Sequence, residues 1–339
     1  MFCYQCEQTA RGSGCTAHGV CGKDPQTAAL QDLLVQQTKQ IGALAHAARR
    51  LGAKDPALDR FILDALFTTV TNVNFDPQRL QTLLVASAAI KKQAQTLYEK
   101  ACRAKGQTPA ISAEMLGAPL AKDLAGLVKQ GLAAGIPQRQ ETWGTDIAGL
   151  QELLVSGLKG MASYAHHALI LGQEDDEVYA FFHEALDALL TDPHPTLEGL
   201  LQLCLRCGAI NLRVMQLLDA AHTGAYGHPE PTAVRIHPLK GKAILISGHD
   251  LKDLEELLKQ TVGTGIKVYT HGEMLPAHGY PELRKYKHLA GNYGGAWQDQ
   301  QIEFSDFPGA ILMTTNCIQK PKKNYLDRIF TCGLVAWPG

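Results

Sequence analysis

The stretch Leu30-Gln-Asp-Leu-Leu-Val35 returns 120 residues later as Leu150-Gln-Glu-Leu-Leu-Val155. Around the first copy, apolar side chains between residues 27 and 51 recur at the spacing of one helix face. A Leu-Gly pair follows each copy, Leu51-Gly52 after the first and Leu171-Gly172 after the second, and glycine there is typical of a helix end. This repeat predicts two copies of one helical unit, produced by an old duplication.

Two further helices are predicted in each copy. They span about residues 56–71 and 76–105 in the first copy, and about residues 176–191 and 196–221 in the second. The weakly patterned stretch 106–145, with several glycines and prolines, links the two copies. Residues 27–225 are therefore predicted to form an all-α domain of two duplicated three-helix bundles.

The pattern changes near Gly224-Ala-Tyr-Gly-His-Pro-Glu-Pro-Thr232, where two glycines and two prolines indicate a linker. Beyond it, short apolar runs alternate with helical patterns, and strands are predicted over residues 242–247, 266–270, 310–313 and within 328–336. Buried strands that alternate with helices are typical of a parallel, doubly wound sheet. We therefore expect residues 226–339 to form an α/β Rossmann-like domain, which makes the fold class mixed.

The composition is that of an ordinary globular protein, with 45% hydrophobic and 19% charged residues. Its 32 basic and 33 acidic side chains leave a net charge of -1, which argues against a nucleic-acid or anionic-membrane partner because both require a concentrated basic patch. The first residues lack the basic and apolar regions of a signal peptide, and no apolar run reaches the roughly 18 residues of a membrane span. We expect a cytoplasmic protein that acts on a small substrate.

Four of the nine cysteines lie close together at the N-terminus, in the pattern Cys3-x2-Cys6-x8-Cys15-x5-Cys21 with several glycines between them. Four thiolates that converge in a glycine-rich loop are typical of an iron–sulfur cluster. From the residues alone, a structural zinc ion remains the main alternative, and disulfides are disfavoured in a reducing compartment. Residues 1–26 are therefore predicted to form a cluster-binding loop.

The other cysteines and one histidine pair carry weaker signals. Cys204 and Cys207 lie among leucines on a predicted helix, which favours packing over a redox pair. Cys102 and Cys332 have no candidate partner in the sequence, and His166-His167 lies on a packed helix, where a structural role is expected.

A second group of candidate ligands follows three of the predicted strands. His249 comes after the strand that ends near Ser247, Glu273 after the strand that ends near Thr270, and Cys317 after the strand that ends near Met313. Ligands of an open α/β sheet bind outside the carboxyl ends of its strands, so these three side chains are expected to point into one crevice.

His271, two residues before Glu273, has two open interpretations. It could act on a bound metal indirectly, as a hydrogen-bond donor or proton relay, or it could be a loop histidine whose ring nitrogens bind elsewhere.

Several motifs along the whole chain are similar to those of the hybrid-cluster proteins, also called prismane proteins. The motifs are the opening Met1-Phe-Cys-Tyr-Gln-Cys-Glu-Gln-Thr9, Ile246-Ser-Gly-His-Asp-Leu-Lys-Asp253, Val268-Tyr-Thr-His-Gly-Glu-Met-Leu-Pro276, Gly291-Asn-Tyr-Gly-Gly295 and Thr314-Thr-Asn-Cys317. The chain resembles the N-terminal two-thirds of such a protein. The resemblance implies a helical domain of two three-helix bundles followed by Rossmann-like domains related to carbon monoxide dehydrogenase.

The same resemblance implies a ligand set. It favours iron and sulfide over zinc at Cys3, Cys6, Cys15 and Cys21, in the 4Fe-4S version of the family rather than the 2Fe-2S version, which has longer gaps. It implies that His249, Glu273 and Cys317 are ligands of a hybrid 4Fe-2O-2S cluster. In the family, three further cysteines, a glutamate and a nearby lysine come from a third domain. We expect that domain to be absent here, and this chain alone not to turn over substrate.

The activity implied by the resemblance is the two-electron reduction of hydroxylamine to ammonia and water. Electrons would come from a redox protein and pass through the N-terminal cluster. Reduction of nitric oxide in nitrosative-stress defence is an alternative at the same site. An alternative of another class is a non-enzymatic scaffold, in which zinc stabilises a helical domain and the α/β domain binds a partner. Metal and sulfide analysis distinguishes the scaffold from the enzyme.

Overall fold

The computed structural model describes residues 1–112 and 115–339 of the chain. These residues divide into two compact units. The helical unit contains residues 1–70, 76–166 and 174–216, and the sheet unit contains residues 71–75, 167–173 and 217–339. The fold class is mixed, as predicted, because a helical N-terminal region is followed by a five-stranded parallel sheet. The predicted domain bounds at residues 26 and 225, and the duplication, stay predictions.

The helices of the N-terminal region agree with the sequence pattern except in two places, the stretch 106–145 and the end of the last helix, which runs to Tyr226 and so includes residues 224–226 of the predicted linker. They are α1 (Pro25–Arg50), α2 (Pro56–Thr68), α3 (Pro77–Ala104), α4 (Leu124–Ala133), α5 (Ile136–Trp143), α6 (Thr145–Leu169), α7 (Asp176–Thr191) and α8 (Leu197–Tyr226). The first three begin at a proline whose preceding aspartate accepts a hydrogen bond from a backbone N–H of the first turn. The stretch 106–145 is more than a linker, because it contains α4 and α5.

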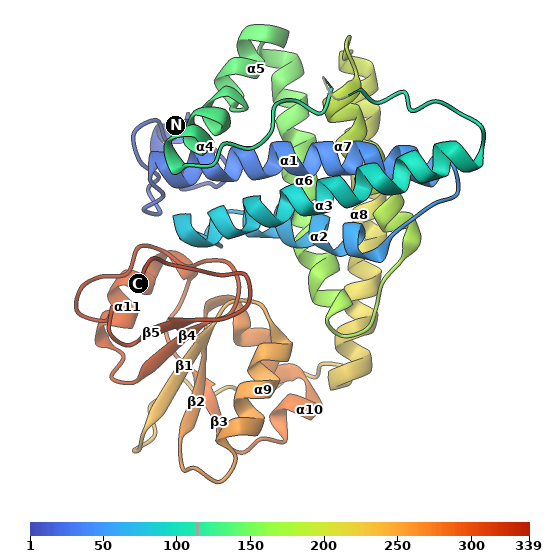
Figure 1. Cartoon of the computed structure of the whole chain (residues 1–339). Coiled ribbons are helices and arrows are strands. Elements are labelled where there is room, and N and C mark those ends of the chain that lie inside the picture. Colours follow the sequence, from blue (N-terminus) through green and yellow to red (C-terminus); the bar gives the residue numbers. More distant parts are fainter. Residues whose placement is uncertain (113–114) are drawn as a thin grey trace. The chain divides into compact units, whose positions relative to one another are not determined.

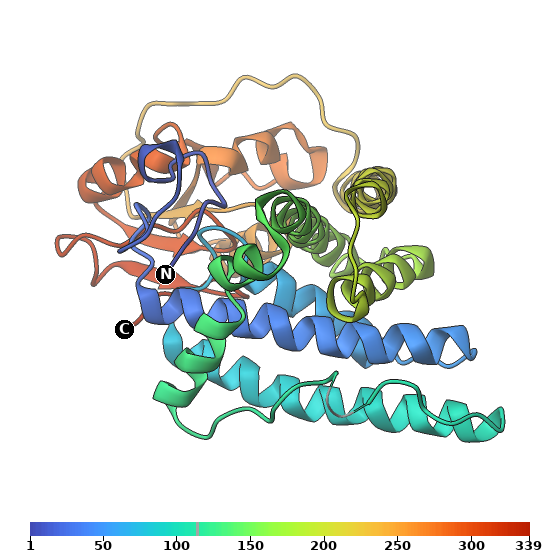
Figure 2. The same ribbon diagram turned by 90° about the horizontal axis from the view of Figure 1, so that it is seen from above.

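Helix α1 forms the centre of the helical unit. Leu30, Leu34 and Ile41 are completely buried, and the helix packs against α2, α3, α4 and α7. Figures 1 and 2 both show the long helices α1 and α3 running side by side. Gly42 allows the close approach of α7, since a Cβ atom there would lie 2.5 Å from the Cβ of Leu186. Helices from both predicted copies therefore share one core.

The contact between α1 and α4 gives a testable prediction about stability. A Cβ atom at Gly131 would lie 1.9 Å from the carbonyl oxygen of Ala29, so Gly131→Ala should lower the free energy of unfolding by roughly 1–3 kcal/mol. Gly149→Ala on α6 is the control, because no atom lies within 4 Å of its added Cβ, and it should be neutral or stabilising by up to about 1 kcal/mol. Urea unfolding of both variants measures the difference. Equal stability would contradict the close approach of α4 to α1.

The sheet consists of five parallel strands in the order β3-β2-β1-β4-β5. They are β1 (Ala243–Ser247), β2 (Lys267–His271), β3 (Leu289–Asn292), β4 (Ala310–Met313) and β5 (Ile329–Thr331). The strand order reverses between β1 and β4, which is the switch point of a doubly wound sheet.

Two features of the sheet differ from the prediction. The strand expected within 328–336 forms only over Ile329–Thr331, and the sequence pattern did not predict β3. The sequence Leu-Ala-Gly-Asn of β3 contains no β-branched or aromatic residue, and Gly291 is needed because a Cβ there would lie 2.2 Å from the carbonyl oxygen of Arg235. The close backbone approach therefore explains the glycine, which weakens the strand signal, and the strand itself forms by pairing with β2.

Helix α9 (Leu251–Thr261) covers one part of the sheet. Leu254 and Leu258 pack in one core cluster with Ile246 of β1 and Val268 of β2. Two short helices, α10 (Pro281–Arg284) and α11 (Gln300–Asp306), and three 3-10 turns at Ala10–Gly12, Gly272–Gly279 and Trp297–Asp299 complete the elements.

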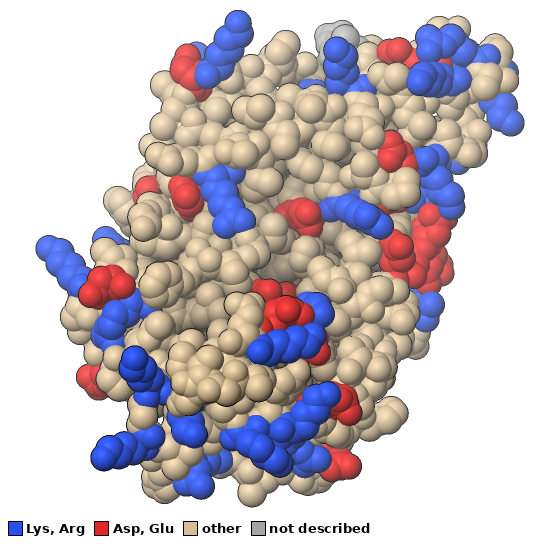
Figure 3. All heavy atoms as spheres, turned by 60° about the horizontal axis from the view of Figure 1, so that its bottom comes forward, with Lys and Arg blue, Asp and Glu red and all other residues tan. Residues whose placement is uncertain are grey.

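Charged side chains of both signs are interspersed on the face shown in Figure 3. Among the described residues, no helix is long and apolar enough to cross a membrane.

Candidate metal centres

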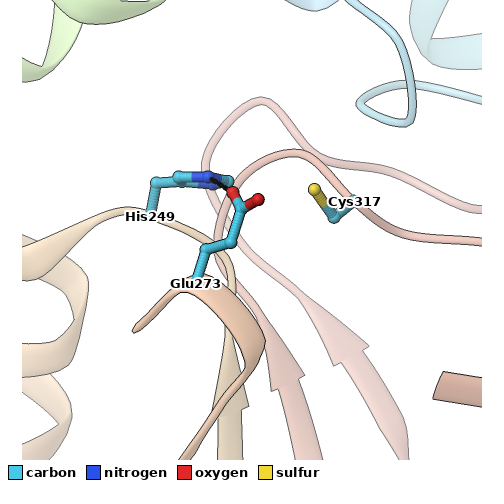
Figure 4. Close-up of side chains that lie close together, drawn as sticks. All are labelled: His249, Glu273 and Cys317. Carbon is cyan, nitrogen blue, oxygen red and sulfur yellow. Dashed lines mark hydrogen bonds and ion pairs between the residues drawn. The ribbon is translucent and has the colours of Figure 1, made fainter. Parts of the chain in front are cut away.

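Three predicted ligands lie together beyond the carboxyl ends of β1, β2 and β4. Ser247, the last residue of β1, pairs with His271 of β2 and with Met313 of β4, so the three strands end at the same level. The loops that follow carry His249, Glu273 and Cys317, and the ligand atoms of these side chains all lie within 4.8 Å of one another. Figure 4 shows the three side chains above the strand ends, with the imidazole and the carboxylate facing each other. The structure thus brings together all three residues that the sequence placed at this edge.

Two hydrogen bonds position His249, one from its backbone amide and one at its imidazole ring. Its amide N–H donates to the hydroxyl of Thr315 at 2.6 Å, and its Nε2 is in hydrogen-bond contact with Oε2 of Glu273. Its Nδ1 is buried without a hydrogen-bond partner among the described residues. Burial lowers the pKa of His249, although the Glu273 carboxylate opposes this, and a neutral imidazole is the form that binds metals.

Cys317 lies in a loop with unusual backbone geometry. Its φ of +79° falls in the left-handed region, which a non-glycine residue adopts only when its surroundings impose it. Gln300, buried beside it, donates from Nε2 to the carbonyl oxygen of Cys317. Asn72 donates from Nδ2 to the carbonyl oxygen of Ile318 at 2.7 Å and accepts the amide N–H of Ile318 at 3.1 Å. Gln300 and Asn72 therefore position Cys317.

The thiol of Cys317 is not a thiolate by itself. Burial, and then the Glu273 carboxylate, raise the pKa of Cys317 to about 12. A metal would have to displace this proton, since the thiolate is the form that binds. The orphaned Nδ1 of His249 and the convergent nitrogen, oxygen and sulfur donors fit a mixed-ligand metal group at this edge.

His271 is the last residue of β2 and is fully buried. Its Nδ1 lies 3.0 Å from the hydroxyl of Ser247, and its Nε2 lies 2.8 Å from Oε2 of Glu303. Glu303 also accepts the amide N–H of Gly295 at 2.7 Å, so a hydrogen bond links the Gly291–Gly295 motif to the pair of His271 and Glu303. Both ring nitrogens thus have partners, and neither partner is one of the three candidate ligands. An indirect role of His271 at the metal stays a prediction.

The N-terminal cysteines lie in a loop of the helical unit. Cys3 and Cys15 face each other as an antiparallel bridge, with N–H to carbonyl hydrogen bonds of 3.1 and 2.8 Å. Gly19 packs against Cys21, where an added Cβ would lie 3.0 Å from the sulfur. All nine cysteines belong to the described residues, and no two of them form a disulfide. Among the described residues, the N-terminal thiols do not form a second group gathered at single-ion distances like that of His249.

Cys15 is the most strongly hydrogen-bonded of these four thiols. Its sulfur accepts the amide N–H of Ala10 at 3.4 Å and lies 3.7 Å from the hydroxyl of Thr9. Burial raises the pKa of Cys15, but hydrogen bonds from the amides of Ala10 and Val20, together with Thr9 and Lys23, more than offset it, and the pKa lies below the ordinary value. Amide hydrogen bonds to thiolate sulfur are a feature of iron–sulfur sites, so the loop fits such a group.

The other four cysteines and the pair His166-His167 do not belong to the group of His249. Cys204 and Cys207 line a largely apolar groove between α6 and α8, and burial raises the pKa of Cys207 to about 11. Cys102 is buried in α3, and Cys332 donates to the carboxylate of Asp253 at 3.2 Å. The ring of His166 lies 2.8 Å from Asp64, and that of His167 lies 3.6 Å from Asp250.

Comparison with known proteins adds a family and relatives. The model of the Prismane/CO dehydrogenase family matches residues 1–339. A relative from Rhodospirillum rubrum named hydroxylamine reductase is 57% identical over 339 residues, covering 100% of this chain and 61% of that protein. A relative of the same name from Geobacter sulfurreducens is 54% identical over 342 residues, covering 100% of this chain and 62% of its own length. The chain thus spans about 61% of the length of the curated relatives it matches.

Among solved structures, a carbon monoxide dehydrogenase from Thermococcus sp. AM4 matches 98% of this chain and 49% of its own, at 13% identity and a TM-score of 0.34. This similarity is too low to establish a shared fold.

Proposed function

Because this chain belongs to the Prismane/CO dehydrogenase family, we propose that it acts in the two-electron reduction of hydroxylamine to ammonia and water. The reaction consumes two electrons and two protons, and it cleaves the N–O bond of hydroxylamine. The observation that carries the proposal is the convergence of His249, Glu273 and Cys317 at the switch point of the sheet, in a chain about 57% identical to a protein named hydroxylamine reductase.

These three side chains would hold part of a hybrid iron–sulfur–oxygen cluster. When bound, such a group supplies iron sites that polarise a small nitrogen substrate. Neutral His249 and anionic Glu273 provide donors of different charge on the same side of the crevice. Glu273 is about half exposed, and its Oε2 is in hydrogen-bond contact with the imidazole of His249, so the two donors are already paired at the strand ends.

The N-terminal loop would hold a 4Fe-4S cluster through Cys3, Cys6, Cys15 and Cys21. Its role in the proposal is to accept electrons one at a time from a redox protein and to pass them on. The hydrogen bonds to the sulfur of Cys15 support an anionic ligand there.

Two other functions remain candidates. Reduction of nitric oxide would use the same donors, and the residues described here do not favour one small nitrogen substrate over the other. A zinc-stabilised scaffold is the alternative of another class, and a single zinc ion would need its sulfur ligands at about 2.3 Å.

The experiment that tests the proposal measures substrate consumption under anaerobic conditions. A protein of the relatives' full length that contains this chain, with a reduced dye as electron donor, should consume hydroxylamine and release ammonia in a one-to-one ratio, faster than it consumes nitric oxide. Iron and acid-labile sulfide should be present. Stoichiometric zinc without sulfide would contradict the enzyme and support the scaffold. A higher rate with nitric oxide would assign the site to the alternative substrate.

A further inference from the structure

A small cavity in the helical unit lies beside the N-terminal cysteine loop. Residues 2–5 and Lys23 of the loop form one side, and the rest comes from α1, α5, α6 and Ala134. Its volume is about 30 Å³, which is room for about one water molecule. The cavity is too small for an organic ligand, so its unusual feature is the set of charged side chains that line it.

The wall carries more positive than negative charge. Four cationic side chains face two carboxylates, and these residues are Lys23, Lys39, Arg139, Lys159, Asp32 and Glu152. Arg139 donates to Glu152 at 2.5 Å, and Lys23 donates to the side-chain oxygen of Gln31 at 2.6 Å. Gln31 is uncharged, so Lys23, Lys39 and Lys159 have no ion-pair partner among the described residues, and the latter two lie on the packed helices α1 and α6.

Both lysines are buried with little to compensate them. Lys39 is 4% exposed and makes no hydrogen bond or ion pair with any residue that the structure describes. Lys159 is 7% exposed, and its Nζ lies 3.4 Å from the carbonyl oxygen of Thr69. If the amide oxygen and nitrogen of Gln5 are exchanged, Gln5 also accepts from Lys159 at 3.2 Å, which ties this lysine to the cysteine loop.

A buried ammonium group without a counter-charge is unfavourable. Burial, and then the charge of Arg139, lower the pKa of Lys39 to about 7, while Glu152 and Asp32 oppose this. Burial likewise lowers the pKa of Lys159, although the carboxylates of Glu152 and Asp32 and a thiolate at Cys3 favour its charged form. Burial raises the pKa of Asp32 to about 6, so this carboxylate is a weak partner for the lysines. The described chain alone therefore supplies too little negative charge.

We propose that the buried ammonium groups of Lys39 and Lys159 are the counter-charge of the N-terminal iron–sulfur centre and raise its reduction potential. This inference rests on the proposed centre at Cys3, Cys6, Cys15 and Cys21. Four thiolates give such a centre a net negative charge, which grows by one when an electron arrives from the donor protein. Buried positive charge nearby stabilises the reduced state, and net charge is one of the determinants of cluster potentials. Lys159, which interacts with Cys3, should have the larger effect.

Redox titration of the full chain, followed by the EPR signal of the reduced centre, tests the inference. Lys159→Met should lower the equilibrium constant for reduction about tenfold, which for one electron is a potential about 59 mV lower. Lys39→Met should lower it by less. Lys159→Arg keeps the charge and should restore most of the potential, whereas Glu152→Gln removes a negative charge and should shift the potential upward. Shifts of opposite sign distinguish a charge effect from a purely structural role.

Lys91→Met is the matched control. Lys91 is a partly buried lysine of α3 that donates to Gln40 at 2.8 Å and does not line the cavity, so its removal should leave the potential unchanged. Replacing a buried lysine that has no ion-pair partner by methionine should not lower the melting temperature, which checks that the variants fold. If Lys159→Met and Lys39→Met assemble the centre and keep the wild-type potential, the inference is overturned. A wild-type chain without any iron–sulfur signal would contradict the proposed centre instead.

Discussion

In a protein of the relatives' full length that contains this chain, replacing Cys317 by alanine should reduce hydroxylamine turnover by more than about 100-fold, because it removes the sulfur donor of the strand-end group. The loss should appear in kcat, and the iron and sulfide content of this centre should fall. The EPR signal of the N-terminal centre should persist, because its four candidate ligands belong to the helical unit whereas Cys317 belongs to the sheet unit. Turnover assays with a reduced dye, together with iron analysis, measure both effects.

Cys332→Ala is the matched control for this variant. Cys332 is also a partly buried thiol of the sheet unit, but it donates to Asp253 and is not in the group of His249. Its replacement should leave turnover and iron content near the wild-type values. Wild-type turnover in Cys317→Ala, or an equal loss in Cys332→Ala, would rule out the assignment of Cys317 as a ligand.

The parts of the fold that follow from local pattern were predictable. Helix α7 has the bounds that its apolar period gave, and α1 differs by one or two residues, because each begins at a capping aspartate. Strands β1 and β4 are mainly apolar runs and β2 contains β-branched and aromatic residues, so the sequence predicted these strands. Their ends indicated that His249, Glu273 and Cys317 lie at one edge. Because ligands bind outside the carboxyl ends of parallel strands, three residues far apart in the sequence were predicted to form one site.

The parts that depend on contacts between distant segments were not predictable. Helix α4 forms against α1 although it contains glycines that weaken helical propensity, and β3 pairs through a bulged register. Asn72 reaches the Cys317 loop across 246 residues of sequence, and no local signal marks it. The cavity wall has the same origin, because Lys39 and Lys159 lie on different helices and become neighbours only when these pack.

The prediction that most directly separates an iron–sulfur centre from the zinc alternative concerns Cys15. It is the buried thiol of the loop, it pairs with Cys3 through two backbone hydrogen bonds, and its sulfur accepts the amide of Ala10. Serine at this position should therefore remove about four iron atoms and their sulfide per chain, together with the brown absorbance.

Cys102→Ser is the control for Cys15→Ser, because Cys102 is equally buried but lies in α3, and it should keep its iron while losing some stability. Metal analysis, sulfide analysis and reduced-state EPR of anaerobically purified chains measure the outcome. If Cys15→Ser retained wild-type iron, sulfide and spectrum, Cys15 would not be a ligand. If the wild-type chain contained one zinc ion and no sulfide, the four thiols would hold a structural zinc ion. The buried lysines of the cavity would then not be the counter-charge of an iron–sulfur centre.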